Sequence, residues 1–466
     1  MEKTPEKKND FSVGSIPGTI MRLAIPMIGA QLVNALYNVV DRIYIGKIPG
    51  EGALPLTGVG LTFPIISIVM AFANLCGMGG APLMSIARGE GNLDRAEKIL
   101  GNAAALLILF GIVIVCAGLY FMEPLLWLFG ASESTIGYAR DYLSIYLIGT
   151  PCVMMVLGMN PYITSQGFAR TGMLTVMIGA VINIVLDPLF IFVFDMGVKG
   201  AALATIISQM LCVPWVLKFL CGKKAIVKLR PRNMRIQWDI TGKILSLGVS
   251  NFTMGLTESA VTITCNSTLQ QYGSMAFVGG GDVYVGVMTV ISTLRQLTML
   301  TLNGLANGAS PVISYNYGAK CYDRTRKSIL FLSVCCLVYA TAAWAILMAI
   351  PGVLIRVFND DPLLVEYGIP AVRMYFCAFC VLFMQMAGQT SFVALGKSRQ
   401  AIFFSLLRKT FIVVPLVLII PRITNLGAFG VFVAEPISDV VGSIACFTTF
   451  MLTVYRRMGK EESPKQ

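Results

Sequence analysis

Oxygen-bearing side chains in three apolar stretches of this sequence have the types and spacing to bind a small cation. In residues 31–41, QLVNALYNVVD, the polar side chains recur every three or four positions and share one helical face: Gln31, Asn34, Asn38 and Asp41. A carboxylate at the centre of a bilayer costs roughly 2.5–3.5 kcal/mol. Such residues therefore face the interior of the helix bundle or a water-filled cavity, and they usually have a function there. The alternative is a buried, neutral Asp41 that only joins helices.

A second acid follows in the stretch IGAVINIVLDPLFIF. Asn183 and Asp187 are four residues apart and therefore share a helical face. Pro188 comes directly after them, and a proline inside a helix removes a backbone hydrogen bond. We expect a locally loosened helix there, with carbonyl oxygens able to bind a cation.

The stretch GAALATIISQ adds the hydroxyl groups of Thr205 and Ser208. If their helices are neighbours, four side chains form one compact, oxygen-rich site: Asp41, Asn183, Asp187 and Thr205. Two acids at close range raise each other's proton affinity, so the site can take up one H⁺ or one Na⁺. The alternative is a purely structural hydrogen-bond network.

The composition requires elements that lie in a membrane. Of the 466 residues, 56% are hydrophobic and 13% charged, against about 25% charged in a soluble protein. Apolar runs long enough to cross about 30 Å of hydrocarbon recur along the chain. We predict an all-α polytopic membrane protein with about twelve spans: 17–45, 54–83, 96–121, 136–165, 169–194, 198–222, 240–271, 276–308, 326–350, 364–394, 400–420 and 427–455.

Cations concentrate in alternate loops. The segment between the sixth and seventh spans, GKKAIVKLRPRNMRIQW, carries six cations and no acid. Lys47, Lys199, Arg356 and Arg422 lie in the loops expected outside, and the other loops are far more basic. The net charge of +12 therefore indicates the positive-inside rule rather than a nucleic-acid partner. We expect both termini in the cytoplasm and the protein in the cell (inner or plasma) membrane.

The two halves of the sequence repeat. At an offset of 229, residues 79–98 align with residues 308–327 and share Gly, Pro, Ser, Gly, Asp, Arg and Lys. The repeat predicts two pseudo-symmetric six-helix lobes related by an axis along the membrane normal, with a substrate path between them. The expected segments are a cytoplasmic tail (1–16), an N-lobe (17–222), a basic linker (223–239), a C-lobe (240–455) and a second tail (456–466).

The second half does not repeat the acidic site, because Ile412 and Leu416 stand at the positions of Asn183 and Asp187. It has buried-charge candidates of its own instead: Glu435, Asp439 and Arg295. Arg295 either pairs with one of these acids or approaches a watery cleft. Glu258 shares a face of the seventh span with Asn251, Thr262 and Asn266; it either attracts a cationic substrate or has a structural role.

Candidate substrate-binding side chains are the remaining polar groups of the spans: Gln31, Asn34, Tyr37, Asn38, Asn160, Glu258 and Gln389. Asn160 and Gln389 are repeat partners at the offset of 229. The twelve cysteines are interpreted as reduced, small core side chains, and the absence of histidine excludes His-based catalysis and imidazole ligation. We find no nucleophile–base pair, phosphate loop or repeated selectivity filter, so we expect neither an enzyme, a cofactor nor a channel.

Several motifs resemble the multidrug and toxic compound extrusion (MATE) family of transporters, most closely its bacterial members. They are QLVNALYNVVDRIYIG, GVGLTFPI, YITSQGFARTGM, NIVLDPLFIF and GVKGAALATIISQ, and the resemblance covers nearly the whole chain. It implies a two-lobed fold of twelve helices and export of cationic or amphiphilic drugs against H⁺ or Na⁺. It also implies a first-lobe ion site, which the chain matches at Asp41, Asn183, Asp187 and Thr205.

Some sodium-coupled members of the family use a second-lobe site with a Glu on helix 7 and an Asp on helix 10. Glu258 resembles the first, but the tenth span offers Gln385 and Gln389 in place of an Asp. We therefore expect a monomeric multidrug antiporter with small cationic drugs and the lipid bilayer as partners. The alternative is a flippase for a lipid-linked precursor from the same superfamily, which should carry several cations in its cleft.

Overall fold

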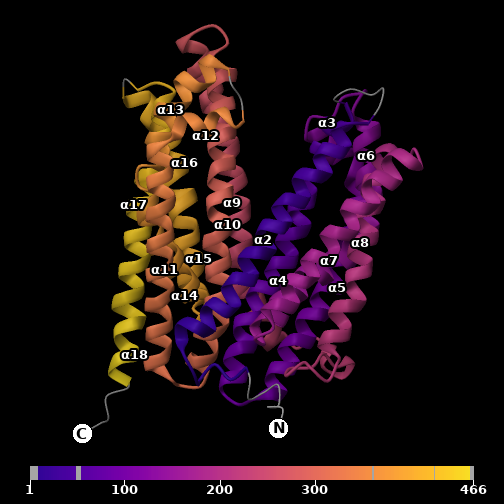
Figure 1. The fold of residues 1–466 in the computed structure, drawn as a ribbon, viewed down its shortest axis with the longest axis vertical. Helices are drawn as coiled ribbons and strands as arrows, with labels where there is room; N and C mark the ends of the chain where they lie inside the picture. The colour runs from indigo at the N-terminus through magenta and orange to yellow at the C-terminus, as the bar shows by residue number, and fades with distance from the viewer. Residues whose placement is uncertain (1–8, 49–53, 359–360, 425, 462–466) are drawn as a thin grey trace. The chain divides into compact units, whose positions relative to one another are not determined.

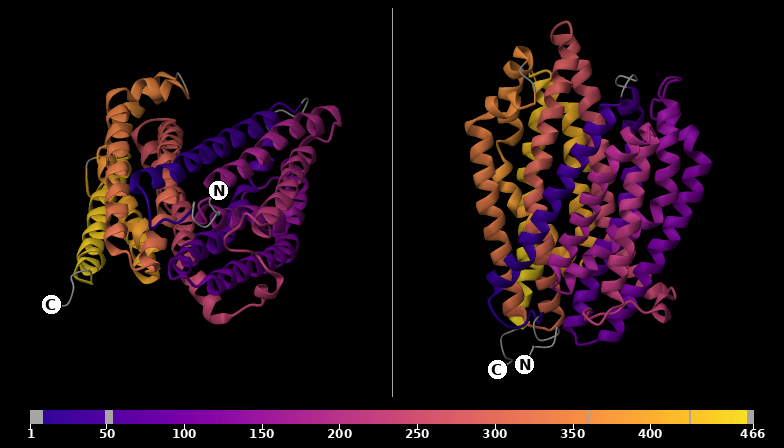
Figure 2. Two further views of the ribbon diagram at one scale, coloured as in Figure 1. Left: turned by 60° about the horizontal axis from the view of Figure 1, so that its bottom comes forward. Right: turned by 45° about the vertical axis from the view of Figure 1, so that its right-hand side comes forward.

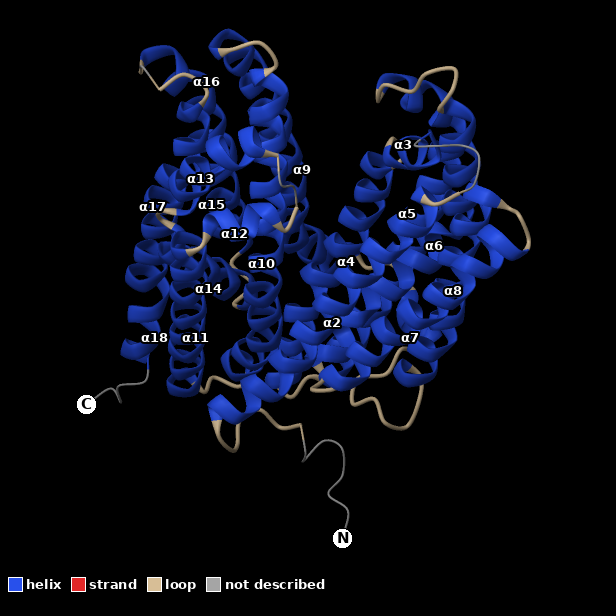
Figure 3. Cartoon of the chain, turned by 45° about the horizontal axis from the view of Figure 1, so that its top comes forward, coloured by secondary structure: helices blue, strands red, loops and turns tan. Residues whose placement is uncertain are grey.

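Helices and the turns between them account for the part of the chain described in the computed structural model, residues 9–48, 54–358, 361–424 and 426–461 (Figure 3). The α-helices are α2 (Ile16–Gly46), α3 (Leu54–Gly60), α4 (Phe63–Gly89), α5 (Leu93–Leu128), α6 (Ile136–Ser165), α7 (Ala169–Pro188), α8 (Gly197–Leu220), α9 (Trp238–Ala276), α10 (Gly280–Gly318), α11 (Tyr322–Ala349), α12 (Pro351–Arg356), α13 (Pro362–Phe376), α14 (Leu382–Ala394), α15 (Ser398–Leu406), α16 (Val414–Ile423), α17 (Phe429–Phe450) and α18 (Arg456–Glu461). Short π-helical turns interrupt the pattern at Leu189–Val193, Leu407–Val413 and Met451–Tyr455.

Eleven helical segments in the described residues are long and apolar enough to cross a membrane, so the chain is a multi-pass membrane protein. They correspond to eleven of the twelve expected spans. The seventh, α9, is a helix of 39 residues that falls short in hydropathy, because Asn251, Glu258 and a series of threonines interrupt its apolar sequence. The eighth expected span, 276–308, continues as α10 to Gly318, well beyond the apolar run that marked it.

By its internal contacts the chain divides into two compact units. The first unit comprises residues 1–13 and 22–252, and the second comprises residues 14–21 and 253–466. The division falls inside α9 rather than at the basic linker 223–239, and the sequence-based segment boundaries stay predictions. Residues 1–8 and 462–466 of the two expected tails lie outside the described residues.

The basic linker is bonded to the first unit. The side-chain oxygen of Gln166, at the end of α6, accepts hydrogen bonds from the backbone amides of Ile226 and Val227 at 2.8 and 2.9 Å. Asn102 on α5 accepts from the backbone amide of Gln237 at 2.6 Å. These buried amides therefore fix the path of the linker before α9 begins.

In the first unit, whose helices run from violet to magenta in Figure 2, α6 packs against α4, α5 and α8, and α7 packs against α8. The core between them is filled by large buried side chains such as Leu100, Met154 and Tyr162. Small residues allow the closest backbone approaches, as expected for helices packed in a membrane. At Gly248 an added Cβ would overlap the carbonyl oxygen of Leu75, so the start of α9 crosses α4 at van der Waals contact.

The second unit, drawn in orange to yellow in Figure 1, is organised around α17 and α10. Helix α17 packs against α13, α14, α16 and the π-helical turn at Leu407–Val413, and α10 packs against α11, α13 and α14. Phe376, Phe392, Phe432 and Phe450 are fully buried in this unit.

Two long helices, α2 and α9, carry Asp41 and Glu258. Helix α2 contacts the first unit through side chains: a Cβ at Gly29 would stand 3.3 Å from the sulfur of Met173 on α7, and the ring of Tyr44 packs edge-on against that of Phe192.

All twelve cysteines are free, as the sequence analysis expected. Their placement as core residues is correct for Cys76 and Cys446, which are buried, and wrong for Cys116 and Cys377, which are exposed. An apolar run does not distinguish core positions from those on the outer surface of a membrane protein, where small apolar side chains are also stable.

Candidate functional site

Three of the four predicted ion-binding side chains are joined directly by hydrogen bonds in the first unit. The Nδ2 group of Asn183 donates to Asp187 Oδ1 at 3.2 Å and to Thr205 Oγ1 at 3.4 Å. Helix α7 supplies the first two residues one turn apart, and α8 supplies the third. All three side chains are buried. The neighbouring hydroxyl of Ser208 instead donates to the carbonyl oxygen of Thr205 at 2.7 Å.

Asp41, on α2, completes the cluster. Its carboxyl group lies within hydrogen-bonding reach of the Asp187 carboxyl group. Within the described residues, no hydrogen-bond donor reaches three of the buried oxygens: Asp41 Oδ1, Asp187 Oδ2 and Asn183 Oδ1. Buried acceptors are expensive when they are left without a partner, and two ionised carboxylates repel each other. The cluster is therefore suited to a proton shared by the two acids or to a small cation between the oxygens.

Three tyrosines surround the acids. Tyr37, four residues before Asp41, lies within electrostatic reach of Asp41 and Asp187. Tyr142 and Tyr146 of α6 stack with their ring centroids 6.2 Å apart, and Tyr142 lies beside Thr205. Sequence reasoning identified Tyr37 but missed the α6 pair, because two aromatic residues four apart in an apolar span are usually packing. The only available signal was their paired hydroxyl groups.

The backbone beside the acids departs from regular α-helix. Helix α7 ends at Pro188, and the next five residues, Leu189–Val193, form a π-helical turn. Such turns are rare and occur often at functional sites. Helix α2, which carries Asp41, contains Pro26 in its interior, and a proline there removes one backbone hydrogen bond.

The remaining polar candidates of α2 lie along the helix that carries Asp41. Gln31 and Asn38 are half-buried and Asn34 is exposed. Asn38 uses its amide nitrogen locally, donating to the carbonyl oxygen of Asn34 at 2.7 Å. Their role in binding a substrate stays a prediction.

Asn160 and Gln389, the repeat partners, make equivalent hydrogen bonds. Asn160 donates to the carbonyl oxygen of Gly172 at 3.3 Å, and Gln389 donates to that of Ala401 at 2.8 Å. Both bonds span twelve residues, and both acceptors are again related by the offset of 229. Each amide therefore fastens the start of the fifth span of its own half, a structural contact that the sequence analysis did not foresee.

The second unit contains a cluster of six charged side chains. Arg295 Nη2 lies 2.8 Å from Glu435 Oε1 and 3.6 Å from Asp439 Oδ1, so the arginine pairs with both candidate acids. A further hydrogen bond joins Arg295 Nη1 to the hydroxyl of Tyr375 at 3.4 Å. Of the two alternatives drawn from the sequence, the ion pair is the one present.

Two members of this cluster were missed. Arg408 Nη1 contacts Asp439 Oδ1 at 2.6 Å, and Lys409 Nζ contacts Glu435 Oε1 at 2.8 Å. Lys409 also lies 3.1 Å from Glu258 Oε2. The cluster therefore contains three cations and three acids. Two adjacent cations inside the apolar run 400–420 were the available signal.

The clusters lie at related places in their own halves. At the offset of 229, Arg408 takes the position of Gly179, and at 230 Asp439 takes the position of Gln209. A Cβ at Gly179 would stand 3.8 Å from Gln209 Nε2, so the neutral contact of the first half is replaced by an ion pair in the second. The pair Arg408–Asp439 thus occupies the positions of Gly179 and Gln209 in the repeat.

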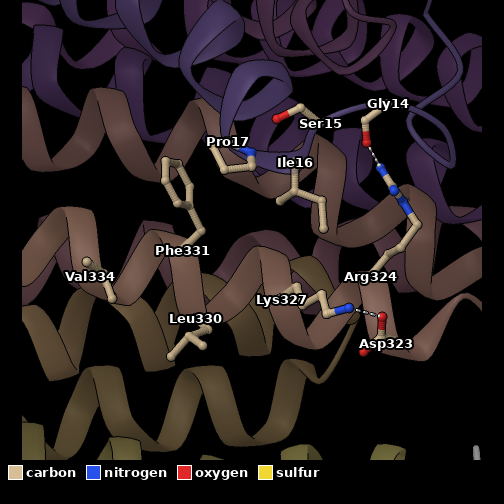
Figure 4. Close-up of a pocket in the computed structure, with 10 residues that line it drawn as sticks. All are labelled: Gly14, Ser15, Ile16, Pro17, Asp323, Arg324, Lys327, Leu330, Phe331 and Val334. Carbon is tan, nitrogen blue, oxygen red and sulfur yellow. Dashed lines mark hydrogen bonds and ion pairs between the residues drawn. The ribbon is translucent and has the colours of Figure 1, made fainter.

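A surface pocket of about 550 Å³ in the second unit contains none of these residues (Figure 4). In the close-up, Arg324 reaches the carbonyl oxygen of Gly14 and Lys327 pairs with Asp323, at 3.1 and 2.6 Å. Leu330 and Phe331 line the apolar side. The bond to Gly14 fastens the chain just before α2.

Comparisons with known proteins agree with this architecture. The chain is 23% identical over 448 residues to the multidrug export protein MepA of Staphylococcus aureus (strain NCTC 8325 / PS 47), covering 96% of this chain and 95% of the relative. It is 24% identical over 355 residues to MepA of Staphylococcus haemolyticus (strain JCSC1435), covering 76% of each.

Solved structures show the same fold. A MATE crystal structure in the bent conformation matches with a TM-score of 0.88 at 24% identity, covering 96% of this chain and 97% of that one. A MATE structure in the straight conformation matches with 0.88 at 23% identity, covering 99% and 100%. The MatE family model matches residues 26–189 and 259–419, one segment in each half. The chain therefore belongs to the MatE family.

Proposed function

We propose that this protein is a multidrug efflux antiporter that exports cationic or amphiphilic small molecules in exchange for H⁺ or Na⁺. The observation that carries the proposal is the acidic cluster of the first unit, in which buried oxygens of Asp41, Asn183 and Asp187 have no donor in the part of the chain that the structure describes. The multidrug export proteins to which the chain is similar support the same assignment. The protein acts in the plasma membrane with both termini in the cytoplasm.

The proposed coupling follows from the placement of the two acids on different helices. Asp187 and Thr205 lie on α7 and α8, which pack against each other, whereas Asp41 lies on α2. A captured H⁺ or Na⁺ removes the repulsion between Asp41 and Asp187 and draws α2 to the cluster. An ion shifts a two-state equilibrium only by its differential affinity for the two states, so ion capture favours the state in which α2 is drawn in.

The test is accumulation of ethidium in cells that express the protein. Asp41→Asn and Asp187→Asn should abolish export while the protein remains in the membrane. Asp195→Asn is the matched control, because Asp195 is exposed and has a positive φ of 53°, which asparagine also tolerates. Full export by Asp41→Asn would remove the proposed mechanism. Replacement of Na⁺ by K⁺ at fixed pH then identifies the coupling ion, since export that persists is driven by protons.

The flippase alternative predicts unpaired cations for lipid phosphates. Arg295, Arg408 and Lys409 are buried cations, but each is paired with an acid of the same cluster. The cluster therefore offers no excess positive charge of the kind that a polyphosphate needs. Everted membrane vesicles separate the two functions. A drug exporter accumulates dye inside such vesicles, whereas a lipid flippase leaves the dye gradient unchanged.

A further inference from the structure

The charged cluster of the second unit is balanced only by an acid at its edge. Arg295, Arg408 and Lys409 are buried, and so are Glu435 and Asp439, which leaves these five side chains with one excess positive charge. Glu258, from α9, supplies the missing negative charge through a contact of 3.1 Å to Lys409 Nζ.

Glu258 differs from the other members in exposure. Its side chain keeps 56% of its surface exposed, whereas that of Lys409 keeps 4%. A half-exposed carboxylate on a membrane helix is costly in hydrocarbon, which places Glu258 in contact with water. The other ion pairs of the cluster join buried partners, so the contact between Glu258 and Lys409 is the one that a dissolved molecule can reach.

The other ion pairs hold Lys409 ready for an anion. Glu435 Oε1 accepts from Lys409 at 2.8 Å and from Arg408 at 3.4 Å, and Arg295 lies 2.8 Å from the same oxygen. One carboxylate oxygen thus serves three cations and cannot neutralise them alone. The π-helical turn at Leu407–Val413 allows the adjacent residues Arg408 and Lys409 to face the same acid, although neighbours on an α-helix point about 100° apart.

We propose that Lys409 is an anion subsite occupied by Glu258, and that the carboxylate of a zwitterionic substrate displaces Glu258 from it. The displaced Glu258 carboxylate then faces the cationic end of the same substrate. The inference rests on the proposed efflux function and names a substrate class for it: amphoteric molecules with one carboxylate and one cationic group. A purely cationic molecule lacks the group that competes for Lys409.

Two rhodamine dyes provide matched probes. Rhodamine 110 carries a free carboxylate, and rhodamine 123 is its methyl ester, so the pair differs in the group that Lys409 would bind. Equilibrium binding to the purified full-length protein is measured by fluorescence anisotropy. Dye binding is measured without transport, so it does not depend on ion coupling at Asp41. If the proposed antiport mechanism is wrong, the efflux assay with Asp41→Asn shows it, and the binding measurement still tests the role of Lys409.

Glu258→Gln removes the internal competitor. It should tighten rhodamine 110 binding at least about threefold, since a site that becomes more often available binds correspondingly more tightly. Rhodamine 123 binding should stay the same or weaken. Glu366→Gln is the matched control, because Glu366 is exposed in the same unit; neither dye should respond to it.

Lys409→Gln should weaken the binding of rhodamine 110 and leave the binding of rhodamine 123 unchanged. Lys409→Arg keeps the positive charge and should bind rhodamine 110 as the wild type does. If Lys409→Gln does not fold, the comparison of Glu258→Gln with Glu366→Gln decides alone. Unchanged or weaker rhodamine 110 binding by Glu258→Gln would overturn the proposal. So would equal weakening of both dyes, because it would make Glu258 a contact for the cationic group or a structural brace. Absence of rhodamine 110 binding in both wild type and Glu258→Gln would also overturn it.

Discussion

Asn183 donates one amide hydrogen to Asp187 Oδ1 at 3.2 Å, whereas Oδ2 of the same carboxylate has no donor among the described residues. The asparagine therefore orients the carboxylate so that one oxygen is available for an ion. Asn183→Ala should weaken ion dependence, because a lost hydrogen bond to a charged group costs about 1.5–3 kcal/mol. The expected result is an ion concentration for half-maximal dye export that rises at least about tenfold. Unchanged ion dependence in a folded variant would show that the orientation of Asp187 does not matter.

Thr205 contributes a hydroxyl oxygen at the edge of the cluster. Thr205→Val keeps the shape of the side chain and removes this oxygen, and it should lower ion affinity by about 1 kcal/mol, or roughly fivefold. Thr205→Ser keeps the oxygen and should behave as wild type. The measurement is the ion dependence of dye export in vesicles. Equal behaviour of the two variants would exclude the hydroxyl as a ligand.

Pro26 gives α2 a position at which it can bend. Pro26→Ala restores a backbone hydrogen bond and removes a penalty of about 3 kcal/mol that a proline imposes inside a regular helix. We expect a variant with equal or higher Tm and slower export. Normal export together with an unchanged Tm would show that bending at this residue plays no part in transport.

The pair Arg408–Asp439 should be strongly coupled. Removal of one partner from a buried ion pair costs about 3–5 kcal/mol, because the other charge is left uncompensated. Arg408→Met and Asp439→Leu should each lower Tm sharply, and the double variant should recover part of the loss. Additive losses in this double-mutant cycle would contradict the 2.6 Å contact.

Gly248 permits the close crossing of α9 and α4. Gly248→Ala introduces a methyl group that overlaps the carbonyl oxygen of Leu75, so the yield of folded protein should fall. Gly242→Ala on the same helix is the control, since nothing lies within 4 Å of its Cβ position. Alanine should stabilise the helix there by up to about 1 kcal/mol. Size-exclusion chromatography of both variants gives the comparison, and equal yields would contradict the crossing.

The helices that lie in the membrane were predictable from the sequence because long apolar runs are its strongest signal. The exception, α9, shows the physical limit of that signal. The polar residues that suggest a function there, including Glu258, also lower the hydropathy on which the prediction of a span depends. The end of α10 was missed for a related reason, since helical structure continues after the apolar run has ended.

The acidic cluster was predictable as a set because Asn183 and Asp187 share a helical face and the family resemblance pairs them with Asp41 and Thr205. Contacts across helices were harder to predict. Tyr142 and Tyr146 look like packing residues until the structure places them beside Asp41 and Thr205. The roles of Arg408 and Lys409 depend on acids that are distant in the chain, Glu435 and Asp439 on α17 and Glu258 on α9.

The most direct test of the account is ion binding by the purified protein. Binding of ²²Na⁺ and proton release on addition of ethidium are measured for wild type, for the double variant Asp41→Asn/Asp187→Asn and for Asp195→Asn. The account predicts that wild type and Asp195→Asn bind Na⁺ or release protons, and that the double variant does neither. Ion binding or proton release by the double variant at the wild-type level would contradict it.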